Sequence, residues 1–164
     1  MTRTSYYLSF RIHQWSFALP VNRISAILEE PEYIERKSNM DYMAGIHLTE
    51  NGVIPIIDPT RVLGLKNHYL QSGQQVVLCN FYVANYLFKI GWRVDELFSV
   101  IDIESEMMDC NCMNSALPFN SMTAGRILSQ DPAVYLIDLG KVFTEDGLLD
   151  VYNDMRKSLG MEVG

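Results

Sequence analysis

AGIHLTENGVIPIIDPTRVLGL, residues 44–65, is the stretch that decides the fold. A polar turn at 49–52 leads into the apolar run Val53–Ile57, which predicts a strand. Asp58 and Pro59 follow, and this pair is typical of an N-cap and first residue of a short helix. Gly64 is a typical C-terminal stop. The stretch therefore predicts a turn, a strand and one helical turn in succession.

The chain contains this unit twice. Asp138 stands 80 positions after Asp58, and VYLIDLGKVF lies over IPIIDPTRVL without a gap. Apolar positions match apolar positions throughout the two segments. The whole chain therefore reads as two versions of one unit, and the repeat places Asp58 and Asp138 as helix caps in equivalent positions.

Each half is expected to hold about five short strands, a sheet so small that it must curl and pack against a neighbour. We therefore predict a mainly β fold of two small five-stranded SH3-like β-barrels with short helices. For Val21–Leu28 a helical turn and a bent strand stay equally open. The halves are placed at 14–70 and 75–145 of a single domain over 1–164, with strand exchange possible at 1–13 and a C-terminal helix at 146–160.

Composition excludes several classes of function. The 164 residues have a net charge of −7 and contain no basic run, which argues against nucleic acid or an anionic membrane surface as a partner. No apolar stretch approaches the roughly 18 residues of a membrane span, and none resembles a signal peptide. Three cysteines do not suggest a secreted disulfide framework. We expect a cytoplasmic protein without direct membrane insertion.

No motif predicts an enzyme, a cofactor or a metal site. The three histidines lack metal-ligand spacing, and the chain has no nucleophile elbow and no phosphate-binding glycine loop. Cys110 and Cys112 are interpreted as two free thiols of one loop, and the alternative is a metal site shared between two molecules. Paired carboxylates for acid–base catalysis are the alternative interpretation of Asp58 and Asp138, but capping explains both from local geometry alone.

The order of these segments resembles the CheW-like family of chemotaxis coupling proteins and kinase regulatory domains. The resemblance is carried by Tyr42, Gly45 and Ile46, followed by VIPIIDPTRVLGL, and by IGWRVDELFSVI in the second half. It implies two five-stranded barrels and no catalysis. It also implies a scaffold that binds the homologous regulatory domain of a histidine kinase and the cytoplasmic tip of chemoreceptors.

One loop departs from the family pattern. Members commonly carry Asn-Leu-Arg-Gly after the glycine, whereas this chain has HLTENG, so Glu50 or Asn51 stands at the place of the arginine, depending on where the loop is aligned. A charge change at an interface alters the choice of partner. We therefore expect a divergent adaptor, for example of a type IV pilus-linked system, and as the alternative a small-molecule sensor using the groove between the barrels. The predicted contact residues are Gly45, His47, Glu50 and Asn51, with Pro20, Asn22, Gly91 and Asp95 near the groove.

Overall fold

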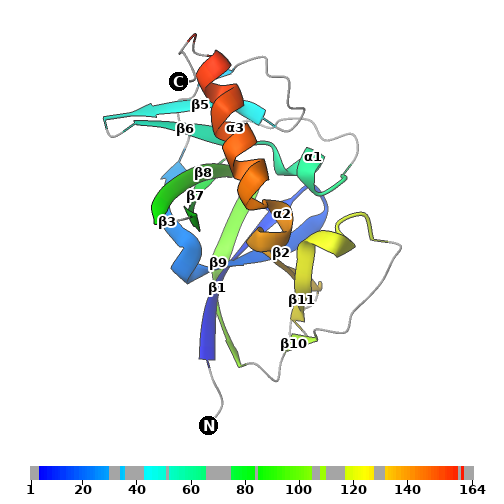
Figure 1. Ribbon diagram of the computed structural model, residues 1–164. Coiled ribbons are helices and arrows are strands. Elements are labelled where there is room, and N and C mark those ends of the chain that lie inside the picture. The colour runs from blue at the N-terminus through cyan, green and yellow to red at the C-terminus, as the bar shows by residue number, and fades with distance from the viewer. Residues whose placement is uncertain are drawn as a thin grey trace.

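The computed structural model describes residues 4–29, 34–35, 43–50, 52–65, 75–83, 85–104, 108–109, 117–127, 132–158 and 160. They form two six-stranded sheets, with the helix α3 (Glu145–Ser158) lying across one of them (Figure 1). Each sheet contains five strands of four to nine residues and one strand of two residues. The predicted mainly β fold with two five-stranded units is confirmed.

The first sheet has the strand order β10-β11-β12-β2-β1-β9. Its strands are β1 (Thr4–Ile12), β2 (Trp15–Pro20), β9 (Glu96–Glu104), β10 (Met108–Asp109), β11 (Thr123–Ile127) and β12 (Val134–Ile137). The second sheet has the order β3-β7-β8-β6-β5-β4. Its strands are β3 (Ile24–Glu29), β4 (Ile34–Glu35), β5 (Met43–Thr49), β6 (Gly52–Ile57), β7 (Gln75–Val83) and β8 (Tyr86–Val94).

The two sheets do not coincide with the halves expected at 14–70 and 75–145, and that division of the chain stays a prediction. The second sheet takes the continuous stretch from β3 to β8, while the first takes β1 and β2 together with β9 to β12. A sequence repeat specifies the order of strands but not the copy with which each strand pairs. β3 and β9 are equivalent in the repeat, yet β3 pairs with β7 and β9 pairs with β1. The β1–β2 hairpin lies in the same sheet as β9 to β12.

The crossing from the first sheet to the second lies in Val21–Leu28. The two readings left open for this segment both apply, because a 3-10 helix, η1 (Val21–Arg23), leads directly into β3. The backbone N–H of Ile24 donates to the carbonyl of Val21 and closes the turn. The turn redirects the chain away from β2 and toward β7.

A parallel strand pair joins the two parts of each sheet. β6 pairs with β8 at Ile56↔Gly91, and β12 pairs with β2 at Leu136↔Ala18, which are the equivalent positions of the repeat. Both Gly91 and Ala18 are buried. A Cβ on Gly91 would lie 2.8 Å from Val76 Cγ1 and would also overlap Ile56, so this position accepts no side chain without displacement.

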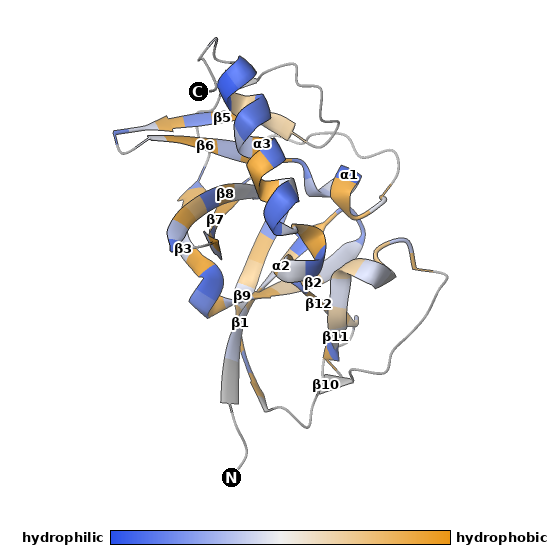
Figure 2. Cartoon of the chain, viewed as in Figure 1, coloured by the Kyte–Doolittle hydropathy of each residue, from blue (hydrophilic) through white to orange (hydrophobic). Residues whose placement is uncertain are grey.

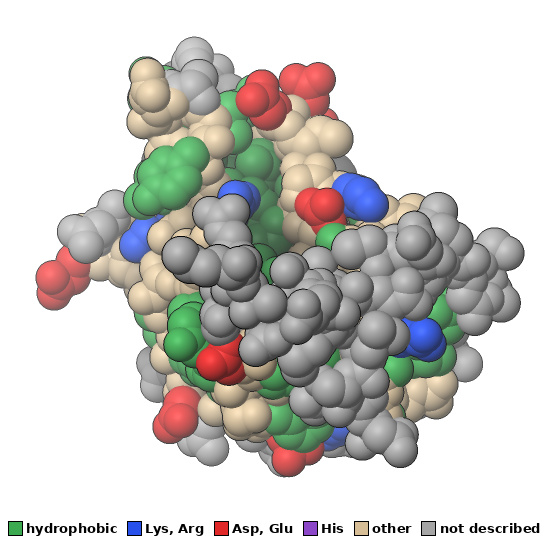
Figure 3. Space-filling view, turned by 90° about the horizontal axis from the view of Figure 1, so that it is seen from below, with side chains coloured by type: hydrophobic (Ala, Val, Ile, Leu, Met, Phe, Trp, Pro, Cys, Tyr) green, Lys and Arg blue, Asp and Glu red, His purple; other side chains and the backbone are tan. Residues whose placement is uncertain are grey.

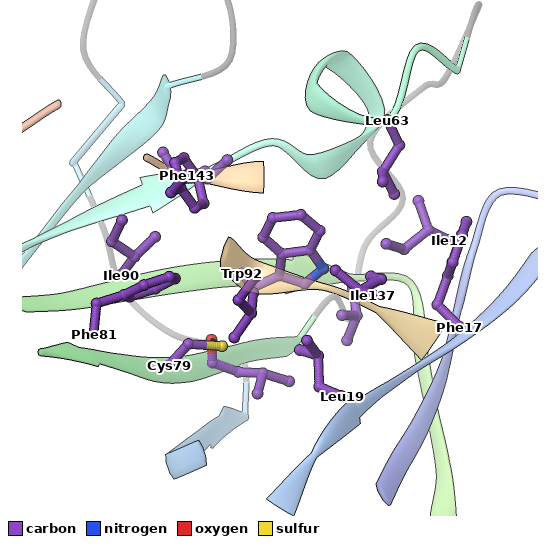
Figure 4. Close-up of a cluster of buried hydrophobic side chains, with 14 of the residues drawn as sticks. Ile12, Phe17, Leu19, Leu63, Cys79, Phe81, Ile90, Trp92, Ile137 and Phe143 are labelled. Atoms are coloured by element: carbon purple, nitrogen blue, oxygen red, sulfur yellow. Dashed lines mark hydrogen bonds between the residues drawn. The ribbon is translucent and has the colours of Figure 1, made fainter. Parts of the chain in front are cut away.

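The main hydrophobic core lies between the sheets and includes residues of both sheets, α2 (Leu139–Val142) and α3. Figure 4 shows the fully buried Trp92 in the middle of this core. Each sheet also has a small cluster of its own, in which Val134 and Leu136 of one correspond to Ile54 and Ile56 of the other. The repeat thus appears in the packing as well as in the sequence.

The short helices have the predicted caps. The Asp58 carboxylate accepts hydrogen bonds from Thr60 N and Oγ1 at the start of α1 (Pro59–Val62), and Asp138 accepts one from Gly140 N at the start of α2. Gly64 has φ +70° after α1, a conformation that favours glycine. The C-terminal helix spans Glu145–Ser158, close to the predicted 146–160.

The helix α3 is amphipathic. Its residues Leu148, Val151 and Met155 are buried against the main core, and Figure 2 shows mostly hydrophilic residues along the rest of the helix, where Leu149 is an exposed exception. Fully burying each such side chain stabilises the fold by roughly 1.5–3 kcal/mol. The helix is therefore an integral part of the core.

Candidate partner-binding surfaces

The β5–β6 hairpin presents the loop that departs from the family pattern. Thr49 pairs with Gly52, so the turn has two residues, and the Thr49 hydroxyl donates to the Gly52 carbonyl at 2.9 Å. Gly52 has φ +141°. Glu50 is exposed at the turn, and Asn51 lies outside the described residues. The predicted charged position is thus on the surface at the tip of a strand pair.

The other two residues predicted for this hairpin lie in β5. His47 is half-buried and pairs with Ile54, whereas Gly45 is buried and pairs with Ile56. Gly45 thus lies inside the sheet, and its role as a contact residue stays a prediction.

The residues predicted near the groove separate into two pairs. Pro20 is half-buried and Asn22 is exposed, so both remain accessible. Gly91 is buried in the second sheet, and the Asp95 side chain is only 3% exposed. Both side-chain positions therefore face inward, and contact of Gly91 and Asp95 with a partner stays a prediction. A repeat places equivalent residues without telling which of them face inward.

Asp95 has an internal role. Its carboxylate accepts a hydrogen bond from His13 N at 2.6 Å and lies 3.9 Å from Arg11 Nη1. Arg11 Nη1 also donates to the His13 carbonyl at 2.7 Å, and His13 has φ +55° at the β1–β2 turn. The cluster holds this turn against the β8–β9 junction.

A hollow of about 320 Å³ lies where Pro20 ends β2. It carries both signs of charge, since Arg23 and Asp138 are its charged lining residues. The Arg23 guanidinium lies 5.6 Å from the centroid of the Phe81 ring, and its Nε has no hydrogen-bond partner among the described residues. The full lining is Tyr7, Pro20, Arg23, Ala124, Leu136, Ile137, Asp138, Leu139 and Gly140.

The equivalent place in the second sheet is filled. Arg93 Nη2 lies 3.1 Å from Asp58 Oδ2, and the Arg93 side chain is 4% exposed. Asp58 corresponds to Asp138, and Arg93 corresponds to Pro20, which has no charge to offer. Arg93 was not among the predicted residues, although a cation inside the apolar run IGWRV is a signal for a buried ion pair.

A second hollow, of about 670 Å³, lies between β6, β8 and α3 and was not predicted. Tyr152 of α3 reaches into it, and its hydroxyl donates to the Lys89 carbonyl at 2.6 Å and accepts from Lys89 N at 2.8 Å. The Tyr152 ring also packs edge-on against Phe88 at 4.9 Å. Pro55 in the middle of β6 is the sequence signal for this opening, because proline interrupts strand pairing.

Cys79 is the cysteine that lies among the described residues, and it is buried. Burial raises the pKa of its thiol to about 12, against a smaller lowering by Arg23. Cys110 and Cys112 lie outside the described residues. In the described ranges no helix is both long enough and apolar enough for a membrane crossing. On the face seen in Figure 3, basic side chains are scattered among acidic ones around an apolar hollow.

Comparison with known proteins identifies the family. A model of the CheW-like domain matches residues 6–147, and the chain therefore belongs to the CheW-like domain family. The crystal structure of the scaffolding protein TtCheW from Thermoanaerobacter tengcongensis is similar in fold, with a TM-score of 0.74 and 15% sequence identity. The likeness covers 88% of this chain and 96% of that one. No curated protein sequence matches the chain.

Proposed function

We propose that the chain is a non-catalytic adaptor of a bacterial chemosensory pathway and acts in the cytoplasm. It couples a chemotaxis-type histidine kinase, through the CheW-like regulatory domain of that kinase, to chemoreceptor tips or to an alternative receptor. The observation that carries the proposal is the match to a CheW-like domain over residues 6–147. The fold of the solved scaffolding protein supports it.

The adaptor is proposed to be a divergent one, as in a type IV pilus-linked system. Glu50 is exposed at the tip of the β5–β6 hairpin, where the family pattern has an arginine nearby. An acidic side chain repels acidic groups that an arginine would bind, so a partner suited to the family arginine is disfavoured here.

Two separate binding assays test these points. The chain is presented to a standard receptor-tip hairpin and to a kinase regulatory domain, as wild type and as Glu50→Arg. Asp150→Arg, at an exposed position of α3, is the matched charge reversal. We expect binding to the kinase domain by all three proteins and stronger receptor binding by Glu50→Arg alone.

The outcomes separate the two parts of the proposal. Absence of binding to both partners would refute the adaptor function itself. Strong receptor binding by the wild type, unchanged in Glu50→Arg, would refute only the divergence.

The second candidate function is a small-molecule sensor, favoured by the hollow with Arg23 and Asp138 at its wall. A ligand with both charges would find a counter-ion for each. A metabolite that binds only the folded protein raises its melting temperature, and a thermal-shift screen with Asp138→Asn as control detects this.

A further inference from the structure

The second sheet is open where the first sheet is closed. Toward the start of β12, two residues of this strand pair with residues of β2, and the equivalent residues of β6 and β8 do not pair. The outermost of these pairs is Val134↔Ser16, and its repeat equivalents are Ile54 and Lys89. β6 and β8 therefore separate before Gly91, and the hollow of about 670 Å³ lies in this gap.

Pro55 explains why the strands separate. Thr49 and Gly52 flank a two-residue turn, so their pair is hydrogen-bonded, and alternation turns the backbone groups of Val53 and Pro55 away from β5, toward β8. Proline has no N–H to donate there. Lys89 obtains its hydrogen bonds from the Tyr152 hydroxyl instead, so one side chain of α3 takes the place of a strand.

Other backbone groups face the same gap. Lys89 lies opposite Asn80 of β7 but directs both its N–H and its carbonyl to Tyr152, away from β7. Alternation along β8 then directs the N–H and carbonyl of Leu87 to the same side. Val53 supplies the corresponding groups from β6. The gap is thus bordered on both sides by backbone groups that can pair with an extended chain.

The side chains around the gap determine which kind of extended segment can bind there. Ile54, Leu78, Leu87 and Met155 provide apolar walls. The charged lining residues are both cations, Lys89 and Arg156, in a chain of net charge −7. The remaining lining residues are Thr49, Gly52, Val53 and Tyr152.

The rim of the gap is also apolar. Tyr82 is paired with Leu87 and is 70% exposed, and Leu48 is paired with Val53 and is 55% exposed. Paired residues of neighbouring strands point to the same face, so these side chains continue the walls outward.

We propose that this gap is a binding site for an extended partner segment that carries both apolar and acidic residues. The segment adds as a strand beside β8, with apolar side chains against the walls and carboxylates within reach of Lys89 and Arg156. The proposal goes beyond the adaptor function and rests on no step of it, since kinase and receptor binding are tested separately.

The test uses a capped peptide of about six residues with alternating glutamate and valine, long enough for one strand. Binding to the full chain is followed by fluorescence anisotropy and by amide chemical shifts. We expect shifts at Leu87, Lys89 and Val53 and slower hydrogen exchange at Leu87 N–H. Lys89→Gln combined with Arg156→Gln is expected to weaken binding roughly two- to tenfold, because two partly exposed charge pairs are lost.

Two control peptides and one variant make the test specific. A peptide with lysine for glutamate tests the charge, and a peptide with N-methylated valine nitrogens tests strand pairing. Both are expected to bind weakly. Tyr152→Phe releases the Lys89 N–H and carbonyl for the peptide, so its binding is expected to be tighter, which a merely structural role of Tyr152 would not produce.

The result that overturns the proposal is absence of binding by the acidic peptide at about 1 mM, the weakest affinity worth considering. Equal binding of the basic or N-methylated peptide, or shifts confined to residues outside the gap, would overturn it as well. Melting temperatures of the variants show that each is folded, so a loss of binding is assigned to the site.

Discussion

Replacing Tyr152 with phenylalanine removes one oxygen atom and should destabilise the fold measurably. The hydroxyl bridges Lys89 N at 2.8 Å and the Lys89 carbonyl at 2.6 Å, while the ring packs on Phe88 independently of it. Leaving partly buried backbone groups unpaired costs about 1–3 kcal/mol. For a chain of 164 residues, a loss of about 2 kcal/mol corresponds to a fall in Tm of roughly 4–8 °C.

The assay is urea unfolding of the wild type, Tyr152→Phe and Tyr82→Phe. Tyr82 is 70% exposed, so loss of its hydroxyl should change the free energy of unfolding by less than about 0.5 kcal/mol. If Tyr152→Phe is as stable as Tyr82→Phe, the hydroxyl does not hold α3 to β8 and the explanation of the gap fails.

The same hydroxyl predicts a pH dependence. Burial raises the pKa of Tyr152 above its ordinary value of 10.0, and the hydrogen bond with the Lys89 backbone lowers it by less. The unfolded chain ionises first as the pH rises, so this stabilisation is complete below about pH 10 and is lost as the pH rises toward the folded pKa. The stability difference between wild type and Tyr152→Phe should therefore narrow above pH 10.

Three further predictions concern buried groups. Asp58→Asn keeps a capping oxygen but removes the counter-ion of Arg93, so urea unfolding should show that the free energy of unfolding falls by about 3 kcal/mol. Asp138→Asn, which removes no such counter-ion, should lower it by less than about 0.5 kcal/mol. Equal losses in the two variants would contradict the difference between the two sites. Gly91→Ala should cost about 1–3 kcal/mol in the same assay, because the added Cβ overlaps side chains of β6 and β7; an unchanged midpoint would refute this packing. Cys79, with its pKa raised to about 12 by burial, should react with iodoacetamide only after unfolding, as followed by mass spectrometry, and rapid labelling of the folded protein would contradict its burial.

The local elements and their order along the chain could be predicted from the sequence. The apolar run after the turn is β6, and Asp58 and Asp138 cap helices at equivalent positions, because these features depend only on neighbouring residues. The pairing of β3 with β7 and of β9 with β1 was not predicted. The two copies of the repeat have strand edges with similar sequences. Whether β3 or β9 pairs with a given edge therefore depends on tertiary contacts, which hydrophobic periodicity does not reveal.

The candidate contact residues show the same limit. Glu50 is exposed, because a polar turn between strands lies on the surface, and its contact with a partner stays a prediction. Gly91 and Asp95 were taken from their positions in the repeat; Gly91 is buried, and the Asp95 side chain is 3% exposed. A position in a repeat does not reveal whether a residue closes a parallel strand pair or holds a neighbouring turn. Those roles depend on partners far away in the sequence.

Each sheet contains a parallel strand pair at an equivalent position of the repeat, and the two sheets differ most at the ends of these pairs. In the second sheet the β6–β8 pair is sealed at one end by Arg93 and Asp58 and is open at the other, where Tyr152 replaces a strand. In the first sheet the β12–β2 pair is closed at that second end and hollow at the first, where Pro20 stands in the place of Arg93. A duplicated unit with identical surfaces would present the same site twice. Because opposite ends have opened, the two hollows of this chain differ, one with charges of both signs and one lined by cations. Two unlike surfaces suit the proposed adaptor, which would have to bind different partners.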